Sequence, residues 1–108
     1  MLAACPKLGS MVLEIAQIDV TPGMNAQFED GVRKARPVIL KSPGCLGVTL
    51  YHSIEQPQRY RFMLQWQTLE HHTVEFRGSE AFQIWRGLVS EFFAQPPSIE
   101  HHEVVEIS

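Results

Sequence analysis

Hydrophobic and polar positions along the chain follow two periods, one typical of strands and one typical of helices. Four short segments are rich in apolar and β-branched residues or alternate with a period of two, which predicts strands. These segments are residues 11–20, 45–54, 59–68 and 99–107. Turn-forming tripeptides such as Thr21-Pro22-Gly23 and Ser42-Pro43-Gly44 bound them.

Two longer segments carry apolar residues at steps of three and four, which predicts helices with one buried face. In residues 24 to 40, that face consists of Met24, Phe28, Val32, Ala35 and Ile39. In residues 80–93, it consists of Phe82, Trp85, Val89 and Phe92. A helical turn is predicted over residues 69–76, between the third strand and the second helix.

The order of these elements is β-α-β-β-α-β, the split unit of the ferredoxin-like α+β fold. We expect Thr68 and Ser79 to cap the helical turn and the second helix, and Pro37 to kink or thin the last turn of the first helix. No linker, repeat or low-complexity tract interrupts the pattern. We therefore expect one domain over residues 12–108, preceded by an N-terminal arm of residues 1–11.

The two faces of the predicted strands differ in polarity. Strand 59–68 has an apolar face of Tyr60, Phe62, Leu64 and Trp66, and a mixed face of Arg59, Arg61, Met63, Gln65 and Gln67. Strand 45–54 has an apolar face of Leu46, Val48, Leu50 and Ile54, and a mixed face of Cys45, Gly47, Thr49 and Tyr51. Since helices cover only one side of such a sheet, a mixed second face favours packing of sheet on sheet. We therefore predict a homodimer.

Composition narrows the function classes. The chain has 108 residues, of which 44% are hydrophobic and 19% are charged, so it is long and apolar enough to form a core. A net charge of -3 gives no reason to expect a nucleic-acid or anionic-membrane partner, and no apolar run approaches the roughly 20 residues of a membrane span.

Only two cysteines are present, so we expect a reduced, cytoplasmic compartment. Leu2-Ala3-Ala4-Cys5 is similar to a lipoprotein cleavage box, but a single residue precedes it, and a short arm is expected instead.

Several familiar kinds of chemistry have no matching pattern. The adjacent pairs His71-His72 and His101-His102 lack the spacing of a zinc site, because neighbouring side chains diverge on a helix or a strand. Cys45 lies in an apolar segment, which favours an unreactive thiol over a nucleophile. No phosphate-binding loop and no Gly-x-Ser-x-Gly sequence is present. We therefore expect neither a metal nor a phosphate cofactor.

An aromatic pocket remains as the candidate site. Trp66 offers a flat apolar wall and an indole N–H, and His72, just past the end of its strand, offers a proton acceptor with an ordinary pKa near 6.5. A small flat organic molecule fits such a pocket. The alternative for His72 is a structural hydrogen bond to the backbone.

A set of motifs, taken in this order, resembles the antibiotic biosynthesis monooxygenase family over residues 12–106. They are Thr21-Pro22-Gly23, Phe28-Glu29, Ser42-Pro43-Gly44-Cys45-Leu46-Gly47, Pro57-Gln58-Arg59-Tyr60, Trp66-x-x-x-Glu70-x-His72 and Phe76-Arg77-x-Ser79-Glu80-Ala81-Phe82. The resemblance implies a dimeric α+β barrel. It also implies oxygenation of a small aromatic or quinol-like substrate by O₂, with no cofactor.

The resemblance further implies the site residues. It assigns catalysis to His72 and Trp66. It assigns substrate binding to Tyr51, His52, Phe62, Phe76, Phe82 and Arg86. Phe62 stands where the anthrone oxygenases of the family have an asparagine, and His72 stands where they have a pocket tyrosine. Ala16 and Arg86 stand near the asparagine and the iron-binding histidine of the haem-degrading members, so no residue is left for haem ligation.

Three hypotheses follow for the function. In the first, His72 removes a proton from an aromatic substrate held against Trp66, and the carbanion reacts with O₂. In the second, His52 and His72 shuttle protons in an isomerase or lyase reaction on a small oxygenated metabolite. In the third, the chain is a ligand-binding dimer without catalysis. Dependence on oxygen separates the first hypothesis from the second, and turnover separates both from the third.

Overall fold

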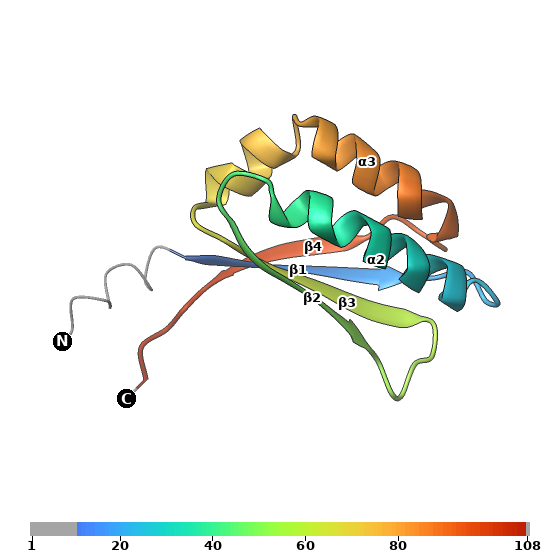
Figure 1. Cartoon of the computed structure of the whole chain (residues 1–108). Coiled ribbons are helices and arrows are strands. Elements are labelled where there is room, and N and C mark those ends of the chain that lie inside the picture. The colour runs from blue at the N-terminus through green and yellow to red at the C-terminus, as the bar shows by residue number, and fades with distance from the viewer. Residues whose placement is uncertain (1–10, 108) are drawn as a thin grey trace.

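Four antiparallel strands form one sheet, and the helices all lie on one of its sides (Figure 1). The structure, a computed structural model, describes residues 11–107, so the Leu2–Cys5 segment lies outside the described residues. The elements are β1 (Val12–Asp19), α2 (Asn25–Leu40), β2 (Cys45–His52), β3 (Arg59–Trp66), the π-helical turn η1 (His71–Phe76), α3 (Glu80–Val89), the 3₁₀ turn η2 (Ser90–Phe92) and β4 (Ser98–Glu103). The strand order β2-β3-β1-β4 confirms the ferredoxin-like α+β fold.

The largest differences from the predicted element boundaries lie at the ends of the second helix and the last strand. The second helix ends at Val89, whose φ of -130° leaves the helical range, and η2 continues the chain to Phe92. The last strand ends at Glu103, which pairs with Val12, the first residue of β1. Among residues 11–107, β1 is the one strand beside β4, and it offers no partner beyond Glu103.

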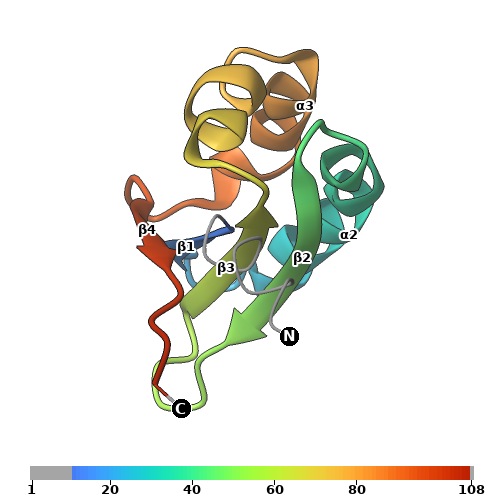
Figure 2. The same ribbon diagram turned by 90° about the vertical axis from the view of Figure 1, so that its left-hand side faces the viewer.

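The predicted helix faces form the core. Phe28, Val32, Ala35 and Ile39 of α2 are buried, as are Ala16 and Ile18 of β1 and every second residue of β3 from Tyr60 to Trp66. The alternation of β1 and β3 is confirmed, since the intervening residues of both strands point to the other side. Figure 2 views the two helices end on, side by side above this layer.

The predicted face of Cys45 is wrong. A β-bulge between Cys45 and Gly47 shifts the register, so that Cys45 lies opposite Trp66 and Gly47 lies opposite Gln65. Cys45 therefore packs against the core instead of facing away from the helices. Ile54, expected on the apolar face, lies beyond the end of β2 and is 91% exposed.

The predicted helix starts are confirmed. The side chain of Ser79 accepts a hydrogen bond from the backbone N–H of Phe82, and Thr68 Oγ1 accepts one from the N–H of His71. Helix α2 runs through Pro37 to Leu40, and its end is closed by Lys41 N–H donating to the carbonyl of Val38 at 3.3 Å.

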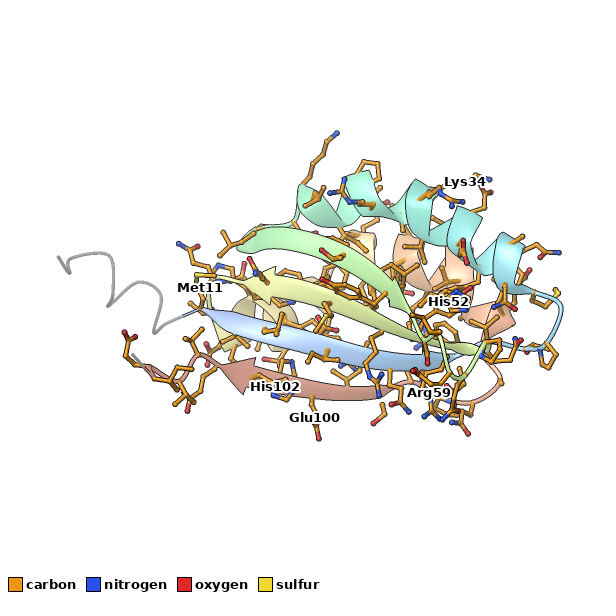
Figure 3. The ribbon with its side chains drawn as sticks, turned by 90° about the horizontal axis from the view of Figure 1, so that it is seen from below. Met11, Lys34, His52, Arg59, Glu100 and His102 are labelled. Atoms are coloured by element: carbon orange, nitrogen blue, oxygen red, sulfur yellow. The ribbon has the colours of Figure 1, made fainter. Side chains whose placement is uncertain are left out.

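No helix of the described residues covers the second side of the sheet, and Figure 3 looks onto it. At one end of this open face, Arg59 forms a two-point ion pair with Asp19, and Arg61 donates to Gln17. The remainder of the face includes Leu13, Ile15, Met63 and Tyr51, which is 55% exposed. Within residues 11–107, no helix is both long and apolar enough to cross a membrane.

Candidate active site

A cavity of about 480 Å³ lies between the helix-covered face of the sheet and α3. That volume is in the usual range for small-molecule sites. Its walls are mostly aromatic and aliphatic, with a few polar groups at defined positions. Its lining includes Glu14, Ala16, Ile18, Phe62, Leu64, His72, Phe76, Arg77, Phe82, Trp85, Arg86 and Ile99.

Glu14 is a buried carboxyl at one wall of the cavity. It lies on the same face of β1 as Ala16 and Ile18, where alternation places it against the helices, and it is 5% exposed. Its Oε1 accepts a hydrogen bond from Trp66 Nε1 at 2.9 Å. No hydrogen bond between described residues uses the other carboxyl oxygen, Oε2. One oxygen of the carboxyl is thus held by the protein, and the second is left for another partner.

Trp66 supports Glu14 from behind and does not line the cavity. The side chain is fully buried, and its rings lie against those of His72 and Phe76, with centroids 5.4 and 5.3 Å apart. Because the indole has a single N–H and Glu14 accepts it, Trp66 has no donor left for a substrate. The direct substrate contact expected of Trp66 is therefore not what this geometry provides.

His72 lines the cavity and joins Glu14 to the edge of the sheet. Its Nε2 lies 3.3 Å from Glu14 Oε1, and its Nδ1 lies 2.7 Å from Nε2 of His101 on β4. The ring is held in place by the π-helical turn, in which the N–H of Arg77 donates to the carbonyl of His72 five residues back. This hydrogen bond places His72 and Arg77 one turn apart, and both side chains line the cavity.

Burial shifts the pKa values of Glu14 and His72 in opposite directions. Desolvation raises the pKa of Glu14 to about 7, although the Trp66 hydrogen bond and the charge of Arg77 act to lower it. Desolvation, with smaller contributions from His101 and Arg77, lowers the pKa of His72 to about 4. At neutral pH the imidazole is therefore neutral, and the carboxyl changes between its acid and base forms near pH 7.

Two guanidinium groups lie beside the aromatic wall. The Cζ atoms of Arg77 and Arg86 lie 5.3 and 5.9 Å from the centroid of the Phe82 ring, within the range of cation–π interaction. Neither arginine forms an ion pair with a carboxylate of residues 11–107. Their positive charge is therefore available to an anionic or electron-rich group in the cavity.

The structure brings together most of the predicted site residues. Five of them line the cavity, namely His72, Phe62, Phe76, Phe82 and Arg86.

Tyr51 and His52 lie elsewhere. Tyr51 is paired with Arg61 on the open face of the sheet, away from the cavity. His52 stacks on Tyr60 with ring centroids 4.3 Å apart and donates to the carbonyl of Pro57. His52 lines a separate hollow of about 380 Å³ between α2 and β2, and Phe62 is the predicted site residue that reaches both spaces.

The sequence prediction missed Glu14, the carboxyl at the cavity wall, and His101, which contacts the cavity residue His72. The signal for Glu14 was present, since a carboxyl on the same strand face as Ala16 and Ile18 is a charge on a buried face. His101 shares the helix side of β4 with Ile99, as their pairing with Glu14 and Ala16 requires. Arg77 lies in one of the sequence motifs but has no predicted role, and Trp85, predicted on the buried face of its helix, stacks on Phe62 with ring centroids 4.6 Å apart.

Other groups near the site are less suited to chemistry. Burial raises the pKa of the Cys45 thiol, so it is less nucleophilic than an ordinary cysteine. Within residues 11–107, no group of three or more His, Cys, Asp or Glu side chains is arranged to hold a metal ion.

Comparison with known proteins identifies relatives along most of the chain. Residues 11–88 match the family model described as antibiotic biosynthesis monooxygenase. The uncharacterised protein YczJ of Bacillus subtilis strain 168 is 36% identical over 95 residues, which cover 88% of this chain and 100% of the relative.

Solved structures agree with this match. A protein of Bordetella bronchiseptica, named as a candidate antibiotic biosynthesis monooxygenase, is 49% identical with a TM-score of 0.87, covering 90% of this chain and 99% of its own. Rv0793 from Mycobacterium tuberculosis has the same fold, with a TM-score of 0.77 at 18% identity, covering 92% of this chain and 99% of its own. The chain belongs to the antibiotic biosynthesis monooxygenase family.

Proposed function

We propose that this protein oxygenates a small aromatic or quinol-like substrate with O₂, using no metal or flavin, and that Glu14 is the proton acceptor. The observation that carries the proposal is the free Oε2 of a carboxyl with a pKa of about 7, in an aromatic cavity. A general base works best when its pKa is close to the working pH. His72, with a pKa lowered to about 4, is a weaker base than an imidazole with the ordinary pKa near 6.5.

For a substrate with an activated CH₂ group, the proposed reaction converts that group into a carbonyl. Glu14 Oε2 accepts a C–H proton, and the carbanion that remains gives electrons to O₂ and forms a C–O bond. Glu14 returns the proton to the peroxide. Loss of the second C–H proton then breaks the O–O bond and forms C=O, and the departing hydroxide is protonated to water. In sum, CH₂ and O₂ give C=O and H₂O, so no further oxidant or reductant is needed.

The neighbours of Glu14 have supporting roles in this proposal. Trp66 holds Oε1 by a hydrogen bond, and His72 Nε2 lies 3.3 Å from the same oxygen, so Oε2 keeps a fixed direction during proton transfer. Arg77 and Arg86, fixed against Phe82, stabilise the negative charge that develops on the substrate oxygen as the carbanion forms. The aromatic walls hold a flat ring system and keep water away from the carbanion.

Oxygen uptake with a panel of hydroxylated aromatic ketones and quinols tests the proposal. We expect turnover by the wild type, and a loss of about 100-fold or more in Glu14→Gln, the usual scale for removing a general base. Glu29→Gln is the matched control, because Glu29 is a carboxyl that accepts the Tyr60 hydroxyl hydrogen bond away from the main cavity. Equal rates in Glu14→Gln and the wild type would reject the role of Glu14.

Two other outcomes favour the alternative functions. Product formation at the same rate under nitrogen would indicate isomerase or lyase chemistry. A thermal shift with several panel compounds but turnover of none would indicate a ligand-binding protein.

We also propose that the active form is a homodimer built on the open face of the sheet. Its support is the exposure of apolar and aromatic side chains on that side, with Tyr51 at 55%, together with Val104 and Val105 after β4 at 57% and 71%. We also propose the cytoplasm as the compartment, since two cysteines in 108 residues do not make the disulfide framework of a small secreted domain.

A further inference from the structure

A continuous series of polar contacts leads from the buried carboxyl of Glu14 to the surface of the protein. Glu14 Oε1 lies 3.3 Å from His72 Nε2, and His72 Nδ1 lies 2.7 Å from His101 Nε2. Glu14 and His72 are 5% and 2% exposed, whereas His101 lies on the edge strand β4 and is exposed. The three residues of this series come from β1, η1 and β4, which are far apart in the chain but adjacent in the fold.

Two arrangements of the hydrogens on the ring nitrogens fit this series of contacts. When Glu14 is a carboxylate, its neighbour Nε2 of His72 carries a hydrogen, so Nδ1 accepts a hydrogen bond from His101 Nε2–H. When Glu14 is protonated on Oε1, that O–H faces Nε2 of His72, and Nδ1–H of His72 donates to His101. The second arrangement holds one proton more than the first. The two interconvert when one hydrogen moves across the Glu14–His72 contact and one across the His72–His101 contact, without rotation of either ring.

We propose that His72 and His101 form a proton relay through which Glu14 exchanges its proton with solvent. A proton that binds Nδ1 of His101 moves Nε2–H of His101 to Nδ1 of His72, and Nε2–H of His72 to Glu14. The reverse series releases it. The use of the relay in turnover rests on the proposed function, in which Glu14 takes up and returns a proton while a substrate fills the cavity.

The charges around the relay favour neutral imidazoles. Arg77 acts on Glu14, His72 and His101, and His102 acts on His101, so positive charge near the relay opposes a stored imidazolium. Cys45 also lies near enough to Glu14 to feel its charge, but its raised pKa keeps the thiol protonated at neutral pH. The proton therefore rests on Glu14 or in solvent and does not remain on the rings.

A purely structural role for His101 makes a different prediction. If His101 only orients His72, any side chain that donates a hydrogen bond to Nδ1 should replace it. Glutamine offers such a donor but cannot pass a proton onward. His101→Gln therefore separates positioning from relay. His102→Gln is the matched control, since His102 is the next residue of β4, pairs with Leu13 and contacts Glu100 instead of His72.

The experiment follows the indole N–H signal of Trp66 by NMR across pH 5 to 9, in protein without any substrate. This signal reports the protonation of Glu14, because the indole donates to its carboxyl. In the wild type and in His102→Gln, we expect one averaged peak that moves with a midpoint near pH 7. In His101→Gln, we expect the same midpoint with a broadened or doubled peak, because exchange of the Glu14 proton is slowed.

Three outcomes would overturn the relay or qualify its use. An unchanged, sharp peak in His101→Gln would mean that Glu14 exchanges protons through the cavity, and would overturn the relay. A titration that survives in Glu14→Gln would mean that another group moves the signal, and would overturn it as well. A slowed exchange in a protein that oxidises no panel compound would support the relay and count against the proposed function alone.

Discussion

The indole N–H of Trp66 donates to Oε1 of Glu14 at 2.9 Å, and both side chains lie on the helix-covered face of the sheet. Trp66 lies opposite Val12, and Glu14 lies opposite Leu64, so the two are diagonal neighbours on adjacent antiparallel strands. The sheet itself therefore sets the position of the buried carboxyl. Trp66 supports the candidate site through Glu14 and makes no contact with the cavity.

Replacing Trp66 by phenylalanine should raise the pKa of Glu14 above 7. The Trp66 hydrogen bond stabilises the carboxylate, and a phenyl ring fills most of the indole space but donates nothing. The midpoint can be read from the ¹³C signal of the Glu14 carboxyl. Trp85→Phe is the control, because Trp85 lines the cavity and stacks on Phe62. A Glu14 midpoint that is the same in both variants would contradict the assigned role of Trp66.

Glu14 should make the folded state less stable as the pH rises. Its pKa is about 7 when folded and 4.5 when unfolded, so between these values the folded protein keeps a proton that the unfolded chain has lost. The stabilisation is complete below pH 4.5 and declines by at most about 1.4 kcal/mol per pH unit up to pH 7. Compared with the wild type, Glu14→Gln should therefore gain relative stability across this interval.

His72 should have the opposite effect. Its pKa is about 4 when folded and 6.5 when unfolded, so its contribution is complete above pH 6.5 and is lost as the pH falls toward 4. Between pH 4.5 and 6.5 the two groups offset each other in the wild type. Urea unfolding at half-unit pH steps measures these slopes, and parallel curves for Glu14→Gln and the wild type would refute the shift assigned to Glu14.

The contact between the two helices should depend on Gly31. A Cβ atom at Gly31 would lie 2.5 Å from the backbone carbonyl oxygen of Leu88, whereas one at Gly87 would have no atom within 4 Å. We expect Gly31→Ala to destabilise the fold by about 1–3 kcal/mol, as overpacking does, and Gly87→Ala to stabilise it by about 0.5–1 kcal/mol. Chemical denaturation of both variants tests this pair. A Gly31→Ala protein as stable as Gly87→Ala would be inconsistent with the packing of α2 on α3.

The open face of the sheet should mediate dimerisation. We expect sedimentation at micromolar concentration to give a dimer, with an interface of roughly 2,000 Å² or more, as in obligate homodimers. Ile15→Glu places a charge at the middle of this face, where Ile15 pairs with Met63, and should give a monomer. Ile84→Glu on α3, where the wild-type side chain is 39% exposed, should remain dimeric. A wild-type monomer would disprove the proposed assembly.

The order of elements and their buried faces could be predicted because each depends on local periodicity. The period of two in β3 and the three-four spacing in α2 both identify the side that packs against the core. The bulge at Cys45 could not be predicted, because it depends on how β2 pairs with β3. The π-helical turn η1 also leaves no mark in the periodicity of its six residues.

The candidate site was predicted only in part, for the same reason. The aromatic walls follow from helix and strand faces, but Glu14 meets a partner 52 residues away and His72 meets one 29 residues away. Such contacts depend on which strands are neighbours, and residue spacing along the chain does not give this. Glu14 is the one charged residue on the buried face of β1, and the apolar residues around it dominate the pattern from which that face is predicted.

Hydrogen–deuterium exchange at the substrate carbon, measured without oxygen, tests most directly whether Glu14 takes the proton. Anthrone in D₂O is a suitable probe, because its acidic CH₂ group can exchange but cannot be oxidised under nitrogen. If Glu14 is the base, the wild type and Glu29→Gln should accelerate exchange, with a rate that rises through a midpoint near pH 7. Glu14→Gln should exchange at the rate of buffer alone. Exchange by Glu14→Gln at the wild-type rate would contradict the account.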